Sequence, residues 1–131
     1  MNIFHVSAEC YPAAKVGGLG DVVGALPKYQ NKLGHSATVL MPFYHNKFRR
    51  ENEFTVVFSG YARLGYITYA FNILEPVNFQ HGFRLLMVDI PGLFDRENVY
   101  SYNDDIERFI TFQIAVMNWM NQLETAPDIV H

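Results

Sequence analysis

The chain has 131 residues and a formal net charge of −3; half of its residues are hydrophobic and only 18% are charged. A single domain usually runs to about 100–200 residues, so the length allows one domain or part of a larger one, and the apolar content excludes global disorder. The acidic balance provides no positive field to hold a polyanion, which excludes nucleic acid as an expected partner.

The cysteine content and the absence of long apolar runs indicate where the protein works. The single cysteine, Cys10, has no partner for an internal disulfide, as is typical of a reducing compartment. No apolar segment approaches the roughly 18 residues of a membrane span, and no basic stretch precedes an apolar run at the N-terminus. We therefore expect a cytoplasmic protein that is not exported and has no membrane partner.

The first third of the chain predicts a strand, a loop, a helix and a second strand. Residues 3–7 form a short apolar run with β-branched members, typical of a strand buried on both faces of a parallel sheet. Residues 37–42 repeat this pattern and end in proline. Between them a helix should end at Gly34, with a kink or break before Pro27. Its apolar positions at helical spacing are Leu19, Val22, Val23, Leu26 and Leu33. The order is that of a βαβ unit.

The remainder of the chain predicts further strands and one more helix. Residues 54–90 are rich in Val, Tyr, Phe and Ile between turn residues, which indicates extended strands ending with one at 85–90. The spacing of Asp104 and Glu107 is that of a capping box, with Asp104 as the cap of a helix that runs to about Leu123. This helix is apolar on more than one face, so we expect it to be covered on two sides.

Three shorter segments complete the pattern. Residues 127–131 resemble the opening of another parallel strand with nothing after it, so we expect a fragment or the start of a longer polypeptide. Residues 44–50 are basic and aromatic; they could rim a cleft or dock a domain, but a solvated loop is favoured. His5 and Trp119 are interpreted as packed side chains.

Residues 15–21, Lys-Val-Gly-Gly-Leu-Gly-Asp, are the most informative segment. Gly17 and Gly18 precede the predicted helix, leave the backbone free to take unusual angles, and let an anion approach amide N–H groups at the positive end of the helix dipole. Lys15 adds a mobile positive charge suited to a diphosphate. In the alternative interpretation the glycines permit only a tight turn and close packing, and Lys15 is solvated. Composition alone leaves both open.

Two well-known phosphate-binding loops do not match this segment. A dinucleotide fingerprint requires a third glycine where Val23 stands and an acidic residue at the end of the second strand, which here ends Leu-Met-Pro. A nucleotide-triphosphatase loop requires its lysine after the glycines, whereas Lys15 precedes them. An oxidoreductase with a nucleotide cofactor is therefore disfavoured.

Two carboxylates bracket the loop. Glu9 follows the first strand and Asp21 stands in the first turn of the predicted helix. At the carboxyl ends of strands such groups can hydrogen-bond sugar hydroxyls or stabilise positive charge in a transition state. In the alternative interpretation Asp21 only complements the helix dipole and Glu9 is a solvated acid, and from the residues alone this is favoured.

Five segments together resemble one family. Residues 5–12 read His-Val-Ser-Ala-Glu-Cys-Tyr-Pro, and residues 15–27 contain Lys-Val-Gly-Gly-Leu, Asp-Val and Gly-Ala-Leu-Pro in order. This closely resembles the N-terminus of bacterial glycogen synthases and plant starch synthases. Residues 93–96 and 102–109 resemble two later family segments, and residues 127–131 resemble the strand before an active-site loop that contains His and Asp.

The resemblance implies an α/β fold: residues 1–131 would be an incomplete N-terminal Rossmann-like domain, a parallel sheet with flanking helices plus extended hairpin strands, in a two-domain GT-B protein. It implies a retaining transferase that moves glucose from ADP-glucose, or less often UDP-glucose, to the non-reducing end of an α-1,4-glucan. Lys15 would contact the donor's diphosphate, Gly17 and Gly18 would bring amides to it, and Glu9 and Asp21 would line the sugar-binding part of the cleft as candidate catalytic carboxylates. No metal or other cofactor is implied.

The resemblance also implies that the second domain and the rest of the active site lie outside these residues, so this chain alone should not catalyse. The alternative is a non-catalytic domain of the same descent that binds glucan or a partner protein. It predicts a complete fold ending at His131, with glucan binding that survives Lys15→Ala. The residues leave open the choice between ADP and UDP donors, the acceptor length and the oligomeric state.

Overall fold

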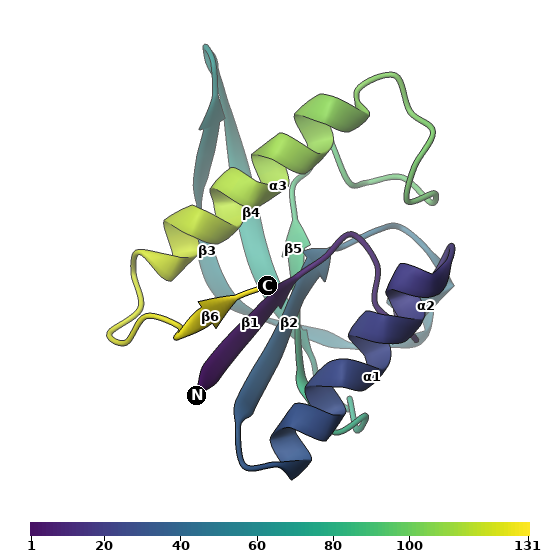
Figure 1. The fold of residues 1–131 in the computed structure, drawn as a ribbon. Helices are drawn as coiled ribbons and strands as arrows, with labels where there is room; N and C mark the ends of the chain where they lie inside the picture. The colour runs from purple at the N-terminus through teal and green to yellow at the C-terminus, as the bar shows by residue number, and fades with distance from the viewer.

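The structure, a computed structural model that describes residues 1–131, is built on one six-stranded sheet of order β3-β4-β5-β2-β1-β6 (Figure 1). β1, β2, β5 and β6 are parallel, whereas β4 runs antiparallel to both β3 and β5. The elements in chain order are β1 (Asn2–Val6), α1 (Gly18–Lys32), β2 (Ser36–Pro42), α2 (Lys47–Glu51), β3 (Phe54–Leu64), β4 (Ile67–Pro76), β5 (Arg84–Asp89), α3 (Asp105–Met120) and β6 (Ile129–Val130). The predicted βαβ unit, the strands within 54–90 and the final parallel strand are confirmed.

The two long helices cover opposite faces of the sheet (Figure 1). Successive side chains of a strand point to opposite faces. On β1, Phe4 stacks on Trp119 of α3 with ring centroids 5.5 Å apart, and its neighbour His5 reaches Gln30 of α1, with 2.7 Å between Nε2 and Oε1. The prediction that His5 and Trp119 are packed is confirmed, and the central strands β2 and β5 are buried between the helices.

The helix α1 differs from its prediction in two ways. It runs unbroken through Pro27, so the expected break is absent. Proline has no N–H for the carbonyl of Val23, and the buried thiol of Cys10 donates to that oxygen instead, at 3.6 Å. The buried face consists of Gly20, Val23 and Pro27, because small side chains let the helix lie close to the loop before it. Four of the five apolar positions at helical spacing are exposed, namely Leu19, Val22, Leu26 and Leu33.

The helix α3 corrects the capping prediction. Asp104 is at the N-cap but makes no capping hydrogen bond, since its carboxylate is paired with Arg96. The helix ends at Met120 rather than near Leu123. It is covered on one side only, and Ile106, Ile110 and Met117 remain exposed.

Residues 44–50 are not a solvated loop. Tyr44 is buried, and its hydroxyl donates to the carbonyl of Ala8 at 2.7 Å. Asn46 caps α2 by accepting from the Arg49 N–H and donates to the carbonyl of Ala13 at 2.8 Å. The segment therefore supports the loop that follows β1. No helix is long and apolar enough to cross a membrane.

Candidate functional site

The loop between β1 and α1 lies at the carboxyl end of a parallel strand, where open α/β sheets bind ligands. Cys10 and Ala14 exchange two backbone hydrogen bonds of 2.9 and 3.0 Å, and the N–H of Tyr11 donates to the carbonyl of Gly20 at 2.9 Å. The loop is thus folded on itself and tied to the first turn of α1. Burial raises the pKa of the Cys10 thiol to about 12, which agrees with a packed rather than a reactive cysteine.

Glu9 is turned into the protein and is only 4% exposed. Its Oε1 accepts the N–H groups of Val16 and Gly17 at 2.7 and 3.0 Å, and its Oε2 accepts the hydroxyl of Tyr100 at 2.6 Å. Burial acts to raise the pKa of Glu9, but the hydrogen bonds from Tyr100 and the loop backbone outweigh it and hold this pKa below its ordinary value. The interpretation of Glu9 as a solvated acid is wrong.

Tyr100 belongs to a loop that is itself held in place. The next residue, Ser101, has a φ of 79°, which is uncommon for a residue other than glycine. The Asp105 carboxylate accepts the N–H groups of Ser101 and Tyr102 at 2.9 and 3.2 Å. Arg108 is fully buried and donates to the same carboxylate at 2.8 Å. The first turn of α3 therefore fixes the position from which Tyr100 reaches Glu9.

Lys15 and Asp21 face outward and lie together. The Lys15 Nζ is 3.0 Å from Asp21 Oδ2, and the two side chains are 44% and 57% exposed. A pair so open to solvent is weakly held, which leaves the ammonium available to an anionic ligand. The structure thus brings these two predicted site residues to one place and separates both from the buried Glu9.

The glycines of the loop provide space rather than unusual backbone angles. Gly17 and Gly18 have no positive φ, and a Cβ on either would meet no atom within 4 Å. Gly18 is the first residue of α1, where an N–H has no intrahelical partner. The Gly17 N–H already donates to Glu9, which corrects the prediction that it is free for a ligand. The open side of the loop thus presents Lys15, Asp21 and the backbone at Gly18.

Sequence reasoning missed Tyr44, Asn46, Tyr100 and Arg108, which support the loop from segments far away in the chain. Tyr100 is 91 residues from its partner Glu9, Tyr44 is 36 residues from Ala8, and Asn46 is 33 residues from Ala13. Arg108 and Tyr100 stand within or beside the family-like segments, and this is the only signal in the sequence that singles them out.

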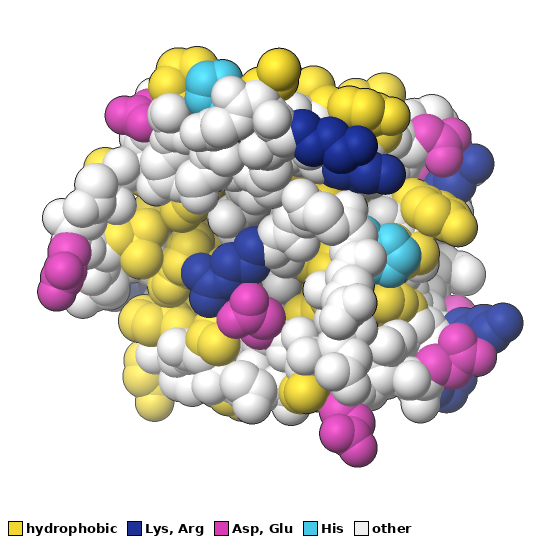
Figure 2. All heavy atoms as spheres, turned by 90° about the horizontal axis from the view of Figure 1, so that it is seen from below, with side chains coloured by type: hydrophobic (Ala, Val, Ile, Leu, Met, Phe, Trp, Pro, Cys, Tyr) yellow, Lys and Arg dark blue, Asp and Glu magenta, His cyan; other side chains and the backbone are white.

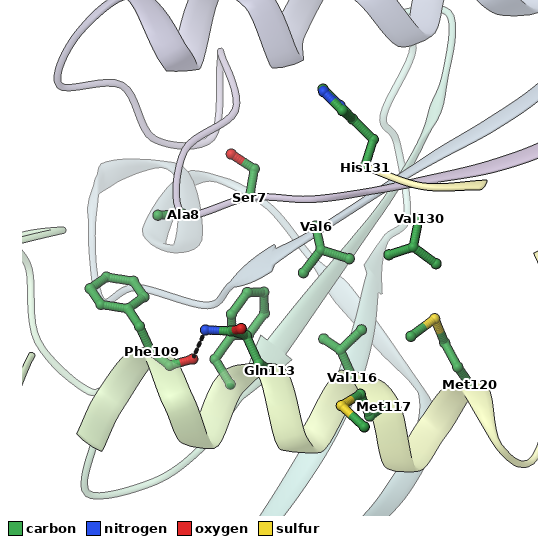
Figure 3. A pocket seen from close by; sticks show the side chains of 11 residues that line it. Val6, Ser7, Ala8, Phe109, Gln113, Val116, Met117, Met120, Val130 and His131 are labelled. Carbon is green, nitrogen blue, oxygen red and sulfur yellow. Dashed lines mark hydrogen bonds between the residues drawn. The ribbon is translucent and has the colours of Figure 1, made fainter. Parts of the chain in front are cut away.

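A hollow of about 420 Å³ lies between the carboxyl ends of two parallel strands and the helix α3 (Figure 3). Its lining comes from the ends of β1 and β6 and from one side of α3, and it is mostly apolar (Figure 3). On the face shown in Figure 2, basic and acidic side chains are interspersed rather than gathered into a basic patch. No group of three His, Cys, Asp or Glu side chains is placed to hold a metal ion.

The comparisons with known proteins agree with this geometry. The family model described as the starch synthase catalytic domain matches residues 2–131. A glycogen synthase of Flavobacterium johnsoniae is 50% identical over 131 residues, and one of Thermus thermophilus is 41% identical over 135. Both alignments cover 100% of this chain, but 28% and 27% of those proteins.

A solved structure has the same fold. The catalytic domain of starch synthase IV from Arabidopsis thaliana, bound to ADP and acarbose, matches with a TM-score of 0.88 and 28% identity. The match covers 99% of this chain and 27% of that one. The fold is that of the N-terminal part of a GT-B glycosyltransferase domain. The chain belongs to the starch synthase catalytic domain family, and it spans about 28% of the length of the curated relatives it matches.

Proposed function

We propose that the protein carrying this chain is a retaining glucosyltransferase that moves glucose from ADP-glucose to the non-reducing end of an α-1,4-glucan. The observation that carries the proposal is the open loop with Lys15 beside the N-terminus of α1, in a chain of this family. Family membership supports a nucleotide-sugar donor and a glucan acceptor. The ADP bound to the Arabidopsis relative supports ADP-glucose over UDP-glucose.

In this proposal Lys15 contacts the diphosphate, and the N-terminus of α1 directs the positive end of its helix dipole at it. Negative charge grows on the departing diphosphate as the glucosyl bond breaks, so fixed positive groups there lower the barrier. Asp21, exposed beside Lys15, hydrogen-bonds the donor's sugar. No metal or cofactor takes part. The free buried thiol of Cys10 supports a cytoplasmic location.

The full activity needs more than residues 1–131. The relatives are more than three times as long as this chain, which supports a second domain that completes the cleft. We therefore expect no turnover by the 131-residue polypeptide alone.

The mass of the gene product is first measured in its source cells. The protein at its natural length is then assayed. Glucose incorporation into glycogen is followed with ADP-glucose and, separately, with UDP-glucose. We expect ADP-glucose to be used and Lys15→Ala to lower kcat/KM for it by about tenfold to a hundredfold, as the loss of one charged contact to the diphosphate predicts. Unchanged donor kinetics in Lys15→Ala would remove Lys15 from the site.

The alternative, a glucan-binding or partner-binding domain without activity, predicts a gene product of about the mass of this chain, 15.1 kDa. It also predicts that glucan binding, measured by co-sedimentation, survives Lys15→Ala.

A further inference from the structure

Both oxygens of the Glu9 carboxylate already accept hydrogen bonds within the fold. Oε1 accepts two backbone N–H groups, Oε2 accepts the Tyr100 hydroxyl, and the side chain is almost fully buried. A carboxylate that accepts or donates a proton at a sugar must reach it within hydrogen-bond distance. Glu9 is only 4% exposed and is bonded through both oxygens, and this argues against a role at the reacting atoms.

The same hydrogen bonds determine which groups of the loop are open to a ligand. Because the N–H groups of Val16 and Gly17 point inward to Glu9, the residues on either side of them, Lys15 and Gly18, are held at the open side. The stem of Lys15 also lies against α1, since a Cβ on Gly20 would be 3.1 Å from the Lys15 Cβ. Loss of the inward bonds would release Lys15 and Gly18 together.

The loop is held from a distant part of the chain. Tyr100 is 91 residues from Glu9 and precedes Ser101, which has a positive φ and donates its backbone N–H to the Asp105 carboxylate. Strained backbone of this kind collects where the surrounding structure fixes a functional geometry. Burial and the hydrogen bond to Glu9 raise the pKa of the Tyr100 hydroxyl to about 12, so it remains a donor at neutral pH.

We propose that Glu9 and Tyr100 are positioning residues: their hydrogen bond sets the glycine-rich loop in the shape that receives the donor's diphosphate. The inference rests on the proposed function for its ligand, but the Glu9–Tyr100 bond and its effect on the loop are independent of it. The geometry assigns Tyr100 to the site although it belongs to a different loop, 91 residues from Glu9 in the chain.

The experiment measures donor kinetics of the protein at its natural length for Tyr100→Phe, Glu9→Gln and Glu9→Ala. We expect Tyr100→Phe to lower kcat/KM for ADP-glucose about tenfold, the factor for one hydrogen bond to a charged group, mainly through KM for the donor. Glu9→Gln should stay within about threefold of the wild type, because its amide oxygen accepts the two N–H groups and its NH₂ donates to the Tyr100 oxygen. Glu9→Ala should lose at least as much as Tyr100→Phe.

Tyr66→Phe is the matched control, because Tyr66 is 98% exposed in the β3–β4 turn and the same atom is removed. Two kinetic results would overturn the inference. One is wild-type donor kinetics in Tyr100→Phe. The other is a Glu9→Gln enzyme as inactive as Glu9→Ala, which would make the charge itself essential. If Tyr100→Phe melts below the assay temperature, the two Glu9 variants decide alone.

Amide exchange separates this inference from the proposed function. In Tyr100→Phe the amides of Val16 and Gly17 should exchange at least tenfold faster, with those of β2 unchanged, whether or not the protein uses ADP-glucose. Unchanged exchange at both amides contradicts the positioning role. A wild-type protein that fails to use ADP-glucose contradicts only the proposed function.

Discussion

Side chains around the loop after β1 face two directions. Lys15 and Asp21 point to solvent and pair with each other, whereas Glu9 and Cys10 point into the fold and bind backbone groups. An exposed pair of this kind contributes about 1 kcal/mol or less to stability, while a buried carboxylate with three hydrogen bonds contributes more. Substitutions of Lys15 and Asp21 should therefore change the use of ligand, and substitutions of Glu9 and Cys10 should change the conformation of the loop.

Two glycines of the same segment should respond oppositely to alanine. A Cβ on Gly24 would lie 2.8 Å from the Tyr11 carbonyl oxygen, and a Cβ on Gly18 would enter open space. We expect Gly24→Ala to destabilise the fold by about 1–3 kcal/mol through overpacking. Gly18→Ala should leave stability within about 0.5 kcal/mol and raise KM for the donor. Urea unfolding and donor kinetics check the pair; wild-type kinetics in Gly18→Ala would show that this space holds no donor.

Glu9 should make stability depend on pH. Its pKa in the fold lies below the ordinary value of 4.5, so the stabilisation it provides is present above that pH and is lost as the pH falls through the lowered pKa. We expect the free energy of unfolding to decrease from about pH 5 downward, and Glu9→Gln to remove part of that decrease. Urea unfolding between about pH 7 and pH 3 measures it, with the exposed Glu124→Gln as control. An equal slope in Glu9→Gln would contradict the role of this carboxylate.

At the scale of elements, one arginine joins α3 to the loop before it. Arg108 donates to the carbonyls of Leu93 and Val99 and to Asp105, and its guanidinium lies over the rings of Phe94 and Tyr102. Only Nη2 lacks a partner. The 15 residues between β5 and α3, which form no helix or strand, are thus tied to α3 by one buried side chain.

Arg108→Lys should destabilise the protein by about 3 kcal/mol, because an ammonium cannot reach three acceptors in different directions and remains buried with bonds unmade. The matched control is Arg84→Lys, since Arg84 makes a half-exposed bidentate pair with Glu75 that should be worth less than about 1 kcal/mol. Chemical denaturation compares the two variants. Similar losses would contradict the importance given to Arg108.

At the scale of the whole molecule, both long helices expose apolar side chains. These are Leu19, Val22 and Leu26 on α1 and Ile106, Ile110 and Met117 on α3. Exposed apolar patches of this kind mark surfaces that associate. We expect the 131-residue polypeptide by itself to associate or partly melt.

Light scattering after gel filtration and a thermal melt check this expectation. The triple variant Ile106→Glu, Ile110→Glu, Met117→Glu should restore a monomer if the α3 surface is responsible. A monomeric wild-type polypeptide with a sharply cooperative transition would contradict the expectation.

The sequence by itself determined the order of the strands and of the two long helices, the parallel core and the family. Apolar runs and turn residues are local signals, and the motif of residues 15–27 requires no knowledge of the fold. It also indicated that Lys15 and Asp21 lie close together, because only five residues separate them, and the structure pairs the two side chains.

Only the tertiary structure decided which face of α1 is buried and that the Glu9 side chain points into the fold. The apolar residues of α1 recur at helical spacing, but only Val23 of them is buried, with Gly20 and Pro27, since close approach of the loop favours small residues. Glu9 accepts a hydrogen bond from Tyr100, 91 residues away. The Asp104 carboxylate pairs with Arg96 instead of capping α3. Tyr100 and Glu9 meet only because the sheet brings two separate loops together, and no local pattern in the sequence indicates such a contact.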